Sequence, residues 1–446
     1  MAVLLPNALS ANENSDKKYA ATDEADVVVV GAGPAGIPAA ISAARNGAKV
    51  LLVEEDSLVG GAPVDMYVSY LCGGPRLGIC KEMREKLAKH YDISGKPSGG
   101  SWFFPSTFAL VLREMIDKEK NIKLITRAPV CGAIMERKGN SNKILGVEYR
   151  DDLGNLFAAK GKVVIDATGT GLLSEFAGAK YMYGREAKSD FGERYALDKA
   201  DDKVQLCTLM CCVQRFRPNA EIDIDALLQN KSFTHRLVLD SGYNFTKDVP
   251  KEKLRSDVYQ YLMWAANAQC DTRDTLALGR AQNKLMTELM PILARNFWKQ
   301  GFTLHIAPKI GVRECRRVIG DKVITSEDLF LPKYPDDVIS QGRYVLDSWG
   351  RGNLKGMEKK ILKFGIPYFA TIVKGIDNLM MAGKHISGTS LAMSAYRVQP
   401  IVASMGQAVG WAAAEAAKKN TSPRNLEVKE IQKAMAKQEI LPKEYA

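Results

Sequence analysis

ADVVVVGAGPAG, residues 25–36, is the stretch that decides the fold. Its first six residues are mostly β-branched and predict a buried parallel strand. The alanine-rich residues 37–46 predict a helix directly after the glycines. In this order, strand, glycine turn and helix are the context in which a G-x-G-x-x-G pattern indicates a dinucleotide-binding unit.

Each glycine of this turn has its own reason to be glycine. Gly31 permits the tight turn, Gly33 lets the backbone approach a pyrophosphate, and Gly36 lets the helix pack against the strand. The N–H groups at the start of the helix are directed at the anion. Together with Pro34 and Ala35, these glycines are the first predicted contacts of the cofactor.

A second predicted strand, residues 49–53, ends at Glu54 and Glu55. A carboxylate at this position can accept hydrogen bonds from the adenosine ribose hydroxyls, and it would repel a 2′-phosphate. Gly60 and Gly61 follow closely and supply a second flexible turn near the dinucleotide. All four residues are therefore predicted cofactor contacts.

Three short strands are predicted over residues 130–135, 144–150 and 156–160, and they form a β-meander. The meander returns to a buried strand over residues 162–167. This strand ends in a further turn, where the backbone of Ala167, Thr168 and Gly169 can approach the cofactor. The arrangement favours FAD over NAD.

The last cofactor signals lie in the C-terminal part of the chain. Residues 378–383 predict a strand that ends in glycine, and a helix is predicted to begin at Pro400, where proline suits the first turn. The positive end of this helix can face the pyrimidine edge of a flavin and stabilise the negative charge that appears on reduction. The predicted contacts in this region are Gly383, Arg397, Pro400, Gly406, Gln407 and Ala408.

The order of these segments resembles that of the FAD-dependent oxidoreductase family with a glutathione-reductase-type flavin fold, which is related to the flavoproteins of fumarate reductase and succinate dehydrogenase. The resemblance extends over residues 26–418. It implies an α/β fold in which a Rossmann-like FAD-binding domain with a β-meander carries an inserted α+β substrate or cap domain. FAD is the cofactor it implies. The resemblance is only weak evidence for the identity of the substrate, because such folds host many reactions.

Five segments are expected along the chain. Residues 1–24 form a flexible tail or signal remnant, 25–200 the first part of the FAD-binding domain, and 201–300 the cap domain. Residues 301–420 return to the FAD-binding domain, and 421–446 form a peripheral tail. Within the cap, residues 206–216 and 236–239 predict strands, and residues 274–300 predict helix.

Composition excludes several classes of protein. The chain has 446 residues, 46% of them hydrophobic and 25% charged, and no apolar run is long enough to span a bilayer. We therefore expect a soluble protein without a membrane span. The net charge of +11 comes from Lys and Arg spread along the chain, which does not favour nucleic acid as a partner.

The cysteines and the N-terminal end carry weaker signals. None of the eight cysteines forms a C-x-x-C pair, so neither a redox-active dithiol nor a metal site is expected. Cys207, Cys211 and Cys212 are interpreted as buried thiols rather than metal ligands.

The N-terminal segment bears on localisation. No Lys or Arg precedes the apolar start of the chain, which favours a cytoplasmic protein. The alternative is export, with residues 1–24 as the end of a longer signal peptide.

The most distinctive segment outside the turns is residues 303–321, which is similar to the family's R-E-x-R-R segment. If it is a strand, Arg313 and Arg317 share a face, where they could clamp a carboxylate or stabilise developing negative charge. The alternative is structural, with Arg313 and Arg316 paired to Glu314, Asp321 or backbone carbonyls between domains. His305 and His385 are the two histidines predicted near the flavin, where either could move a proton.

These observations lead to a functional hypothesis. The chain is expected to exchange a hydride between flavin N5 and a small polar substrate, either a sugar derivative or a carboxylic acid, and an external electron acceptor or donor resets the flavin. Two alternatives remain: an FAD-dependent RNA-modifying protein, and an electron-transfer subunit without a small substrate. A homodimer is left open.

Overall fold

A computed structural model describes residues 17–91, 103–139, 141–221, 223, 243–244, 260–348 and 360–445. Its largest sheet has seven strands, and the strand order of its main path is β3-β2-β1-β6-β5-β4, with β15 paired to β6. The first four strands of the path and β15 run parallel. The predicted Rossmann-like α/β fold is confirmed.

The parallel strands are apolar and buried where they meet at the centre of the sheet, as expected of strands that helices cover on each side. The four valines that end β1 are almost completely buried. These strands are β1 (Thr22–Val30), β2 (Val50–Val53), β3 (Ile122–Ile125), β6 (Leu156–Asp166) and β15 (Leu379–Met381). Because β15 pairs with the last residues of β6, a segment far along the chain completes the sheet.

The predicted meander is present. β4 (Val130–Lys138) pairs antiparallel with β5 (Ser141–Arg150), and β5 pairs antiparallel with β6. The long strand β6 therefore joins the two parts of the sheet: it pairs with β5 over residues 156–160 and in parallel with β1 over residues 158–166.

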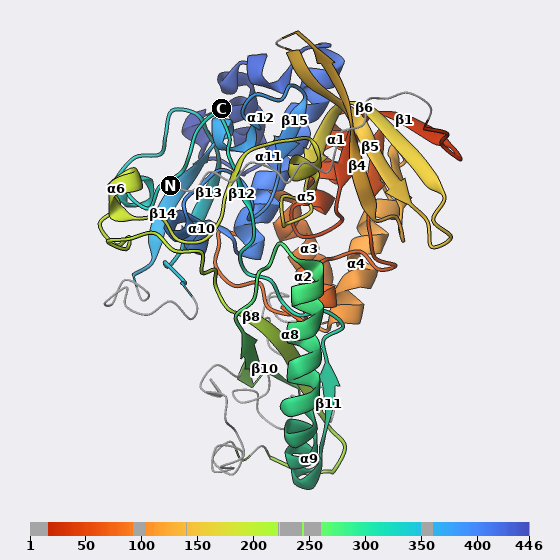
Figure 1. Ribbon diagram of the computed structural model, residues 1–446, viewed down its shortest axis with the longest axis vertical. Helices are drawn as coiled ribbons and strands as arrows, with labels where there is room; N and C mark the ends of the chain where they lie inside the picture. The colour runs from red at the N-terminus through yellow and green to blue at the C-terminus, as the bar shows by residue number, and fades with distance from the viewer. Residues whose placement is uncertain are drawn as a thin grey trace.

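Two helices with small residues pack face to face next to the sheet. They are α1 (Gly36–Arg45) and α11 (Gln399–Lys418), shown in Figure 1. A Cβ atom on Gly406 would lie 2.1 Å from the carbonyl oxygen of Ala35, and one on Gly410 would lie 2.0 Å from that of Ala39. Glycine at these two positions lets the helix backbones approach each other closely.

Seven further α-helices of the described residues lie around this core. They are α2 (Ala62–Asp65), α3 (Gly78–Tyr91), α4 (Pro105–Asp117), α5 (Leu172–Phe176), α6 (Lys188–Phe191), α10 (Ser390–Tyr396) and α12 (Val428–Lys437). Two small sheets accompany them: β7 (Tyr181–Met182) pairs with β12 (Arg317–Val318), and β13 (Val338–Tyr344) pairs with β14 (Leu362–Pro367).

A second lobe projects from this body, at the bottom of Figure 1. Its sheet has the order β11-β8-β10-β9, and two helices accompany it. The elements are β8 (Cys207–Arg215), β9 (Tyr243–Asn244), β10 (Gln260–Ala268), α8 (Thr275–Glu288), α9 (Met290–Gln300) and β11 (Phe302–Ile306). The lobe has its own hydrophobic cluster, which includes Leu209, Leu293 and Phe297.

The expected segment boundaries stay a prediction, but two of their details can be compared with the structure. Residues 236–239 and most of residues 1–24 lie outside the described residues. The end of the chain, expected to be peripheral, instead packs into the main core, where Ile431 and Met435 of α12 are fully buried. In the described part of the chain, no helix is both long enough and apolar enough to cross a bilayer.

Candidate functional site

Three backbone turns meet at the carboxyl ends of β1, β6 and β15. The N–H of Ala167 donates to the carbonyl of Val30, and the N–H of Ala382 donates to the carbonyl of Asp166, both at 2.9 Å. A Cβ atom on Gly31 would lie 2.5 Å from the carbonyl oxygen of Ala167, so only glycine permits this approach. In α/β sheets, ligands bind at such an edge.

The second glycine turn covers the first. The N–H of Gly60 donates to the carbonyl of Ala32 at 2.8 Å. A Cβ atom on Gly61, whose φ is +57°, would lie 3.0 Å from the Cα atom of Gly33. The structure thus brings together two turns that the sequence separates by almost thirty residues.

Glu54 lies buried at the end of β2, where its carboxylate accepts hydrogen bonds from the N–H groups of Ala32 and Asp56. Burial raises the pKa of Glu54 to about 7. Glu55, by contrast, is exposed, and together with Asp56 it pairs with the ammonium of Lys309. Because Lys309 binds two of these three adjacent carboxylates, we assign no metal to them.

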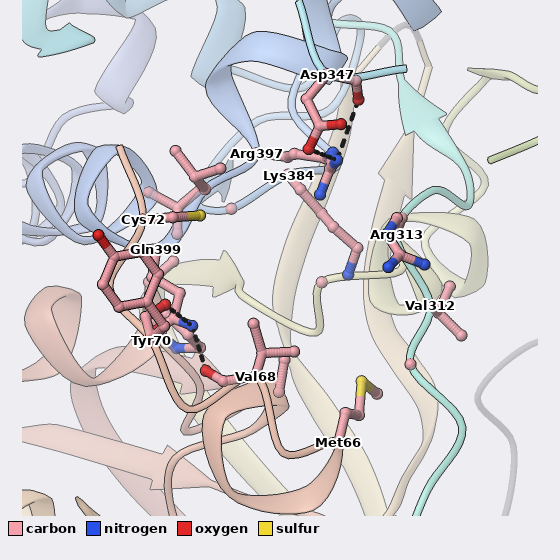
Figure 2. Close-up of a pocket in the computed structure, with 18 of the residues that line it drawn as sticks. Met66, Val68, Tyr70, Cys72, Val312, Arg313, Asp347, Lys384, Arg397 and Gln399 are labelled. Atoms are coloured by element: carbon pink, nitrogen blue, oxygen red, sulfur yellow. Dashed lines mark hydrogen bonds and ion pairs between the residues drawn. The ribbon is translucent and has the colours of Figure 1, made fainter. Parts of the chain in front are cut away.

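A cavity of about 400 Å³ opens beside the three turns (Figure 2). Six of the predicted cofactor contacts line it: Pro34, Ala35, Ala167, Gly169, Gly383 and Arg397. Thr208 and Arg313 line it from the side of the second lobe. The cavity therefore lies between the predicted flavin turns and the predicted cap.

The cavity is suited to a dinucleotide with an anionic part. Pro34 and Ala35, just before α1, line it, and so do Val398 and Gln399 at the start of α11. Neither helix start has a side-chain cap or an acidic residue in its first turn. Two positive helix ends are thus open toward the cavity, which fits the diphosphate and the electron-rich ring edge of a reduced flavin.

Three cationic side chains line the cavity and appear together in Figure 2. Arg397 pairs with Asp347 at 2.7 Å. Arg313 donates to the carbonyl oxygen of Leu206 at 2.7 Å and to the hydroxyl of Thr208. These bonds fix both guanidinium groups in the cavity wall.

Lys384 is the third cation. Among the described residues, none forms a hydrogen bond or an ion pair with its ammonium group. Burial, together with the positive charge of Arg397, lowers the pKa of Lys384 to about 8. Burial also lowers the pKa of Arg313, to about 10. The cavity thus contains more positive than negative charge.

His385 does not line the cavity. It is fully buried, and its Nε2 lies 3.1 Å from the carbonyl oxygen and 3.3 Å from the carboxylate of Asp166. Burial alone would raise the pKa of Asp166, but His385 and the hydrogen bonds donated by Ser174 and Thr168 outweigh burial and lower it. His385 supports the turn after β6, which is a structural position.

His305 also lies apart from the cavity. It is an exposed residue of β11, and its Nε2 lies 3.2 Å from the side-chain oxygen of Gln214 on the neighbouring strand. The expectation that it lies near the flavin site is not met, because β11 directs this side chain toward the surface of the second lobe.

Residues 303–321 do not form one continuous strand. β11 ends at Ile306, and only Arg317 and Val318 return to strand, as β12. Arg313 and Arg317 therefore do not share a strand face. Arg313 lines the cavity, whereas Arg317 does not.

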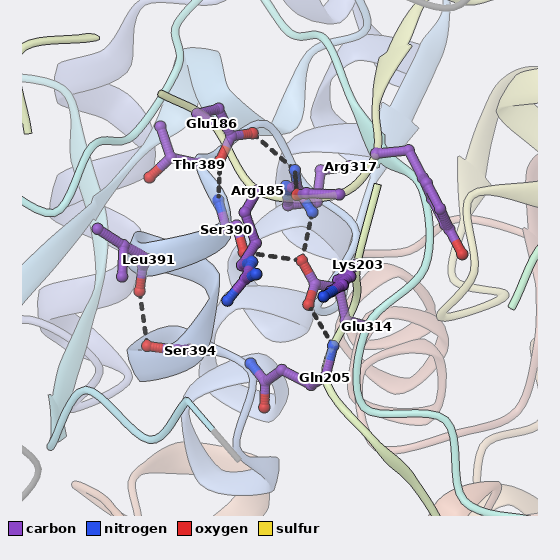
Figure 3. Close-up of polar contacts among 12 residues, drawn as sticks. Arg185, Glu186, Lys203, Gln205, Glu314, Arg317, Thr389, Ser390, Leu391 and Ser394 are labelled. Atoms are coloured by element: carbon purple, nitrogen blue, oxygen red, sulfur yellow. Dashed lines mark hydrogen bonds and ion pairs between the residues drawn. The ribbon is translucent and has the colours of Figure 1, made fainter. Parts of the chain in front are cut away.

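Arg317 is the centre of a buried ionic cluster next to α10 (Figure 3). Its guanidinium binds the carboxylates of Glu314 and Glu186 at 2.5 and 2.6 Å, and it donates to the carbonyl of Gly184 at 2.7 Å. The two carboxylates also accept hydrogen bonds from the hydroxyl and the N–H of Ser390. Arg317 therefore holds a structural position, in place of the predicted position facing a substrate.

Only the start of α11 lines the cavity. Pro400 lies in its first turn. Gln407 accepts a hydrogen bond from the N–H of Ile79 and donates to Gln438, both at 2.7 Å, and Gly406 and Ala408 are buried within the helix packing. The structure thus gives the last three predicted contacts of this helix structural positions away from the cavity.

Sequence reasoning missed several residues of the cavity wall. Lys384 directly follows the predicted contact Gly383, and its position after a strand-ending glycine was a usable signal. Tyr70, Cys72 and Asp347 come from connecting segments and Tyr344 ends β13, and none of the four lies in a motif. Only the fold brings them to the cavity.

The comparisons with known proteins agree with this architecture. The profile of the family described as FAD dependent oxidoreductase matches residues 26–435. Digeranylgeranylglycerophospholipid reductase 1 of Methanococcoides burtonii is 30% identical over 168 residues, which are 33% of this chain and 38% of that protein. A fumarate reductase (cytochrome) of Shewanella frigidimarina is 59% identical over 39 residues, which are 9% of this chain and 7% of that protein.

Two longer alignments were also found. Ferredoxin–NADP reductase of Lactococcus lactis subsp. cremoris is 25% identical over 52% of this chain and 69% of its own. A geranylgeranyl bacteriochlorophyll reductase-like structure from Thermoplasma acidophilum covers 94% of this chain and 84% of its own, at 16% identity and a TM-score of 0.39. The chain thus spans well under two thirds of the first two relatives, and slightly more than two thirds of the ferredoxin reductase.

Proposed function

The chain belongs to the FAD-dependent oxidoreductase family, and from this premise we propose that it oxidises or reduces a small organic molecule that carries a carboxylate. When bound, FAD supplies the hydride chemistry. The turns at Gly31, Gly169 and Gly383 would hold it, together with the starts of α1 and α11.

The observation that carries this proposal is the position of Lys384 and Arg313 on one cavity. Among the described residues that line the cavity, the acidic one is Asp347, and its carboxylate is paired with Arg397. Arg313 offers a planar guanidinium and Lys384 a compact ammonium, and both bind carboxylates well. An anionic substrate would balance their charges, whereas a neutral sugar would leave a buried cation without compensation.

The other residues of the cavity would orient the substrate and exclude water. Met66, Val68 and Val312 give the wall an apolar part (Figure 2). The amide of Gln399 is fixed by donation to the carbonyl of Val68 at 2.7 Å. A fixed polar group in an apolar wall determines orientation more than affinity.

The alternatives receive less support. An electron-transfer subunit without its own substrate would need the cavity for FAD alone, and it would have no use for Lys384 and Arg313 as a carboxylate site. An RNA-modifying protein would need a wide basic surface, whereas the three cations described here lie within one cavity. The external electron acceptor or donor remains part of the proposal and is not identified by the cavity.

Anaerobic titration of the FAD-loaded protein tests the proposed function. Small 2-hydroxy acids and unsaturated carboxylic acids are added in turn with matched sugars and NAD(P)H, while the visible flavin band is recorded. We expect a carboxylic acid either to bleach the oxidised band or to reoxidise the reduced flavin. Turnover of the sugars alone would contradict the proposal.

Binding of a carboxylate is expected to depend on pH through Lys384. Its pKa of about 8 means that the ammonium is charged at pH 7 and mostly neutral at pH 9. The Kd of acetate, followed by perturbation of the flavin band, should therefore rise about tenfold from pH 7 to pH 9. Burial raises the pKa of two further wall groups, Cys72 and Tyr344, above their ordinary values. Arg313, with a pKa of about 10, stays mostly charged at pH 9.

The matched control is Lys384→Arg. Arginine keeps its charge throughout this range, so the variant should bind acetate with the same Kd at both pH values. If the pH dependence persists in Lys384→Arg, another group is responsible and the assignment to Lys384 is wrong.

A further inference from the structure

Two cysteines far apart in sequence lie together in the second lobe. Cys207 begins β8 and Cys270 follows the end of β10, and their sulfur atoms are 3.8 Å apart. The two strands are antiparallel, with Cys207 opposite Ala268. The fold thus brings together a thiol pair that the absence of a C-x-x-C motif had made unexpected.

The two thiols differ in environment. Cys207 is fully buried, whereas Cys270 is only partly buried and lies between exposed Gln269 and Asp271. In the neutral pair the Cys270 thiol donates to the Cys207 sulfur. Once Cys270 has lost its proton, the Cys207 thiol can donate to the Cys270 thiolate instead, and this interaction lowers the pKa of Cys270. Cys270 therefore has the features of an attacking thiol, and Cys207 those of a resolving thiol.

Only a small movement separates this pair from a disulfide. A disulfide requires the sulfur atoms to approach to about 2 Å. Cys270 lies beyond the last paired residue of β10, so no ladder hydrogen bond to β8 holds its backbone. Cys315 is not a competing partner, because its thiol donates to the carbonyl of Thr272 at 3.2 Å.

We propose that Cys207 and Cys270 form a reversible disulfide, with glutathione disulfide or a similar low-molecular-weight disulfide as oxidant. The Cys270 thiolate attacks the S–S bond of the oxidant, forming a mixed disulfide and releasing one thiol. The Cys207 thiol then loses its proton and attacks the Cys270 sulfur, releasing the second thiol. Two protein thiols are oxidised and one small disulfide is reduced to two thiols.

The site adjoins the cavity wall. Thr208, the residue after Cys207, accepts a hydrogen bond from Arg313, and both line the cavity. The disulfide is nevertheless a separate proposal, because its formation depends on neither the bound flavin nor the substrate. Its failure would leave the proposed function intact.

The test uses the FAD-loaded protein in glutathione redox buffers of increasing oxidised fraction. Free thiols are then blocked, and the peptides are analysed by mass spectrometry without reduction. We expect a peptide that links Cys207 to Cys270, at least tenfold more abundant than any other cysteine pair, and dithiothreitol should remove it. Cys131→Ser, which removes an exposed cysteine elsewhere, should leave the linked peptide unchanged.

Cys270→Ser provides the discriminating variant, because this side chain is only partly buried. It should abolish the linked peptide and leave Cys207 as a free thiol. The proposal is overturned if wild-type protein stays fully reduced in the most oxidising buffer. It is also overturned if Cys270 accumulates as a mixed disulfide with glutathione that Cys207 does not resolve.

Discussion

Arg317→Met is expected to lower the free energy of unfolding by about 3–5 kcal/mol, because it leaves two carboxylates buried without their cation. Arg317 is 1% exposed, and it binds Glu314 and Glu186, which are also buried. Methionine keeps most of the side-chain volume, so the expected loss comes from the missing charge and hydrogen bonds rather than from a void.

Urea denaturation measures this loss, with Arg113→Met as the control. Arg113 forms an ion pair with Asp117 on the exposed surface of α4, where both side chains are more than half exposed. The same replacement there should cost less than about 1 kcal/mol. Equal effects of the two replacements would show that the buried cluster does not stabilise the fold.

A further variant separates charge from packing. Adding Glu314→Gln and Glu186→Gln to Arg317→Met removes the uncompensated charges, and it should recover part of the lost stability. If the triple variant is less stable than Arg317→Met alone, the hydrogen bonds to Ser390 matter more than the ionic balance.

Lys384→Met is expected to weaken the binding of acetate at pH 7 by at least about thirtyfold, since losing one partner of a buried charge pair costs about 2–5 kcal/mol. Lys384 lines the cavity, and no described residue forms an ion pair with its ammonium group. The measurement is the same titration of the flavin band, and an unchanged spectrum without acetate shows that FAD is still bound. The loss should be larger than the one that wild-type protein shows between pH 7 and pH 9.

Lys374→Met is the matched control, because it removes one exposed positive charge outside the cavity. It should leave the Kd of acetate unchanged within a factor of two or so. If both variants weaken binding equally, the effect comes from the net charge of the protein and not from the cavity.

The parts of the fold that were predictable are those that local chemistry dictates. The β-branched run before Gly31, the glycines of the turn and the carboxylate Glu54 follow from the constraints of a strand that ends at a dinucleotide. The meander and the strand before Gly383 could also be predicted, because alternating or apolar runs are bounded there by turn residues.

The remaining parts of the site depend on contacts that no local pattern encodes. The arginine segment was considered as a strand, yet its backbone leaves the strand after Ile306, and this sends Arg313 and Arg317 to different environments. The two histidines could not be placed from sequence, because one is held by Asp166 from another strand and the other faces solvent. Long-range packing likewise decides that Gly406 contacts Ala35 instead of a ligand.

The position of β15 and α11 in the chain has a consequence for synthesis. Both elements complete the site from β1, β2 and β6, but they lie more than two hundred residues later in the sequence. At the usual rate of translation, the early strands and α1 would emerge from the ribosome tens of seconds before their partners. During this interval the apolar face of α1 has no cover from α11. The nascent chain therefore cannot complete its cofactor site until almost all of its residues are made.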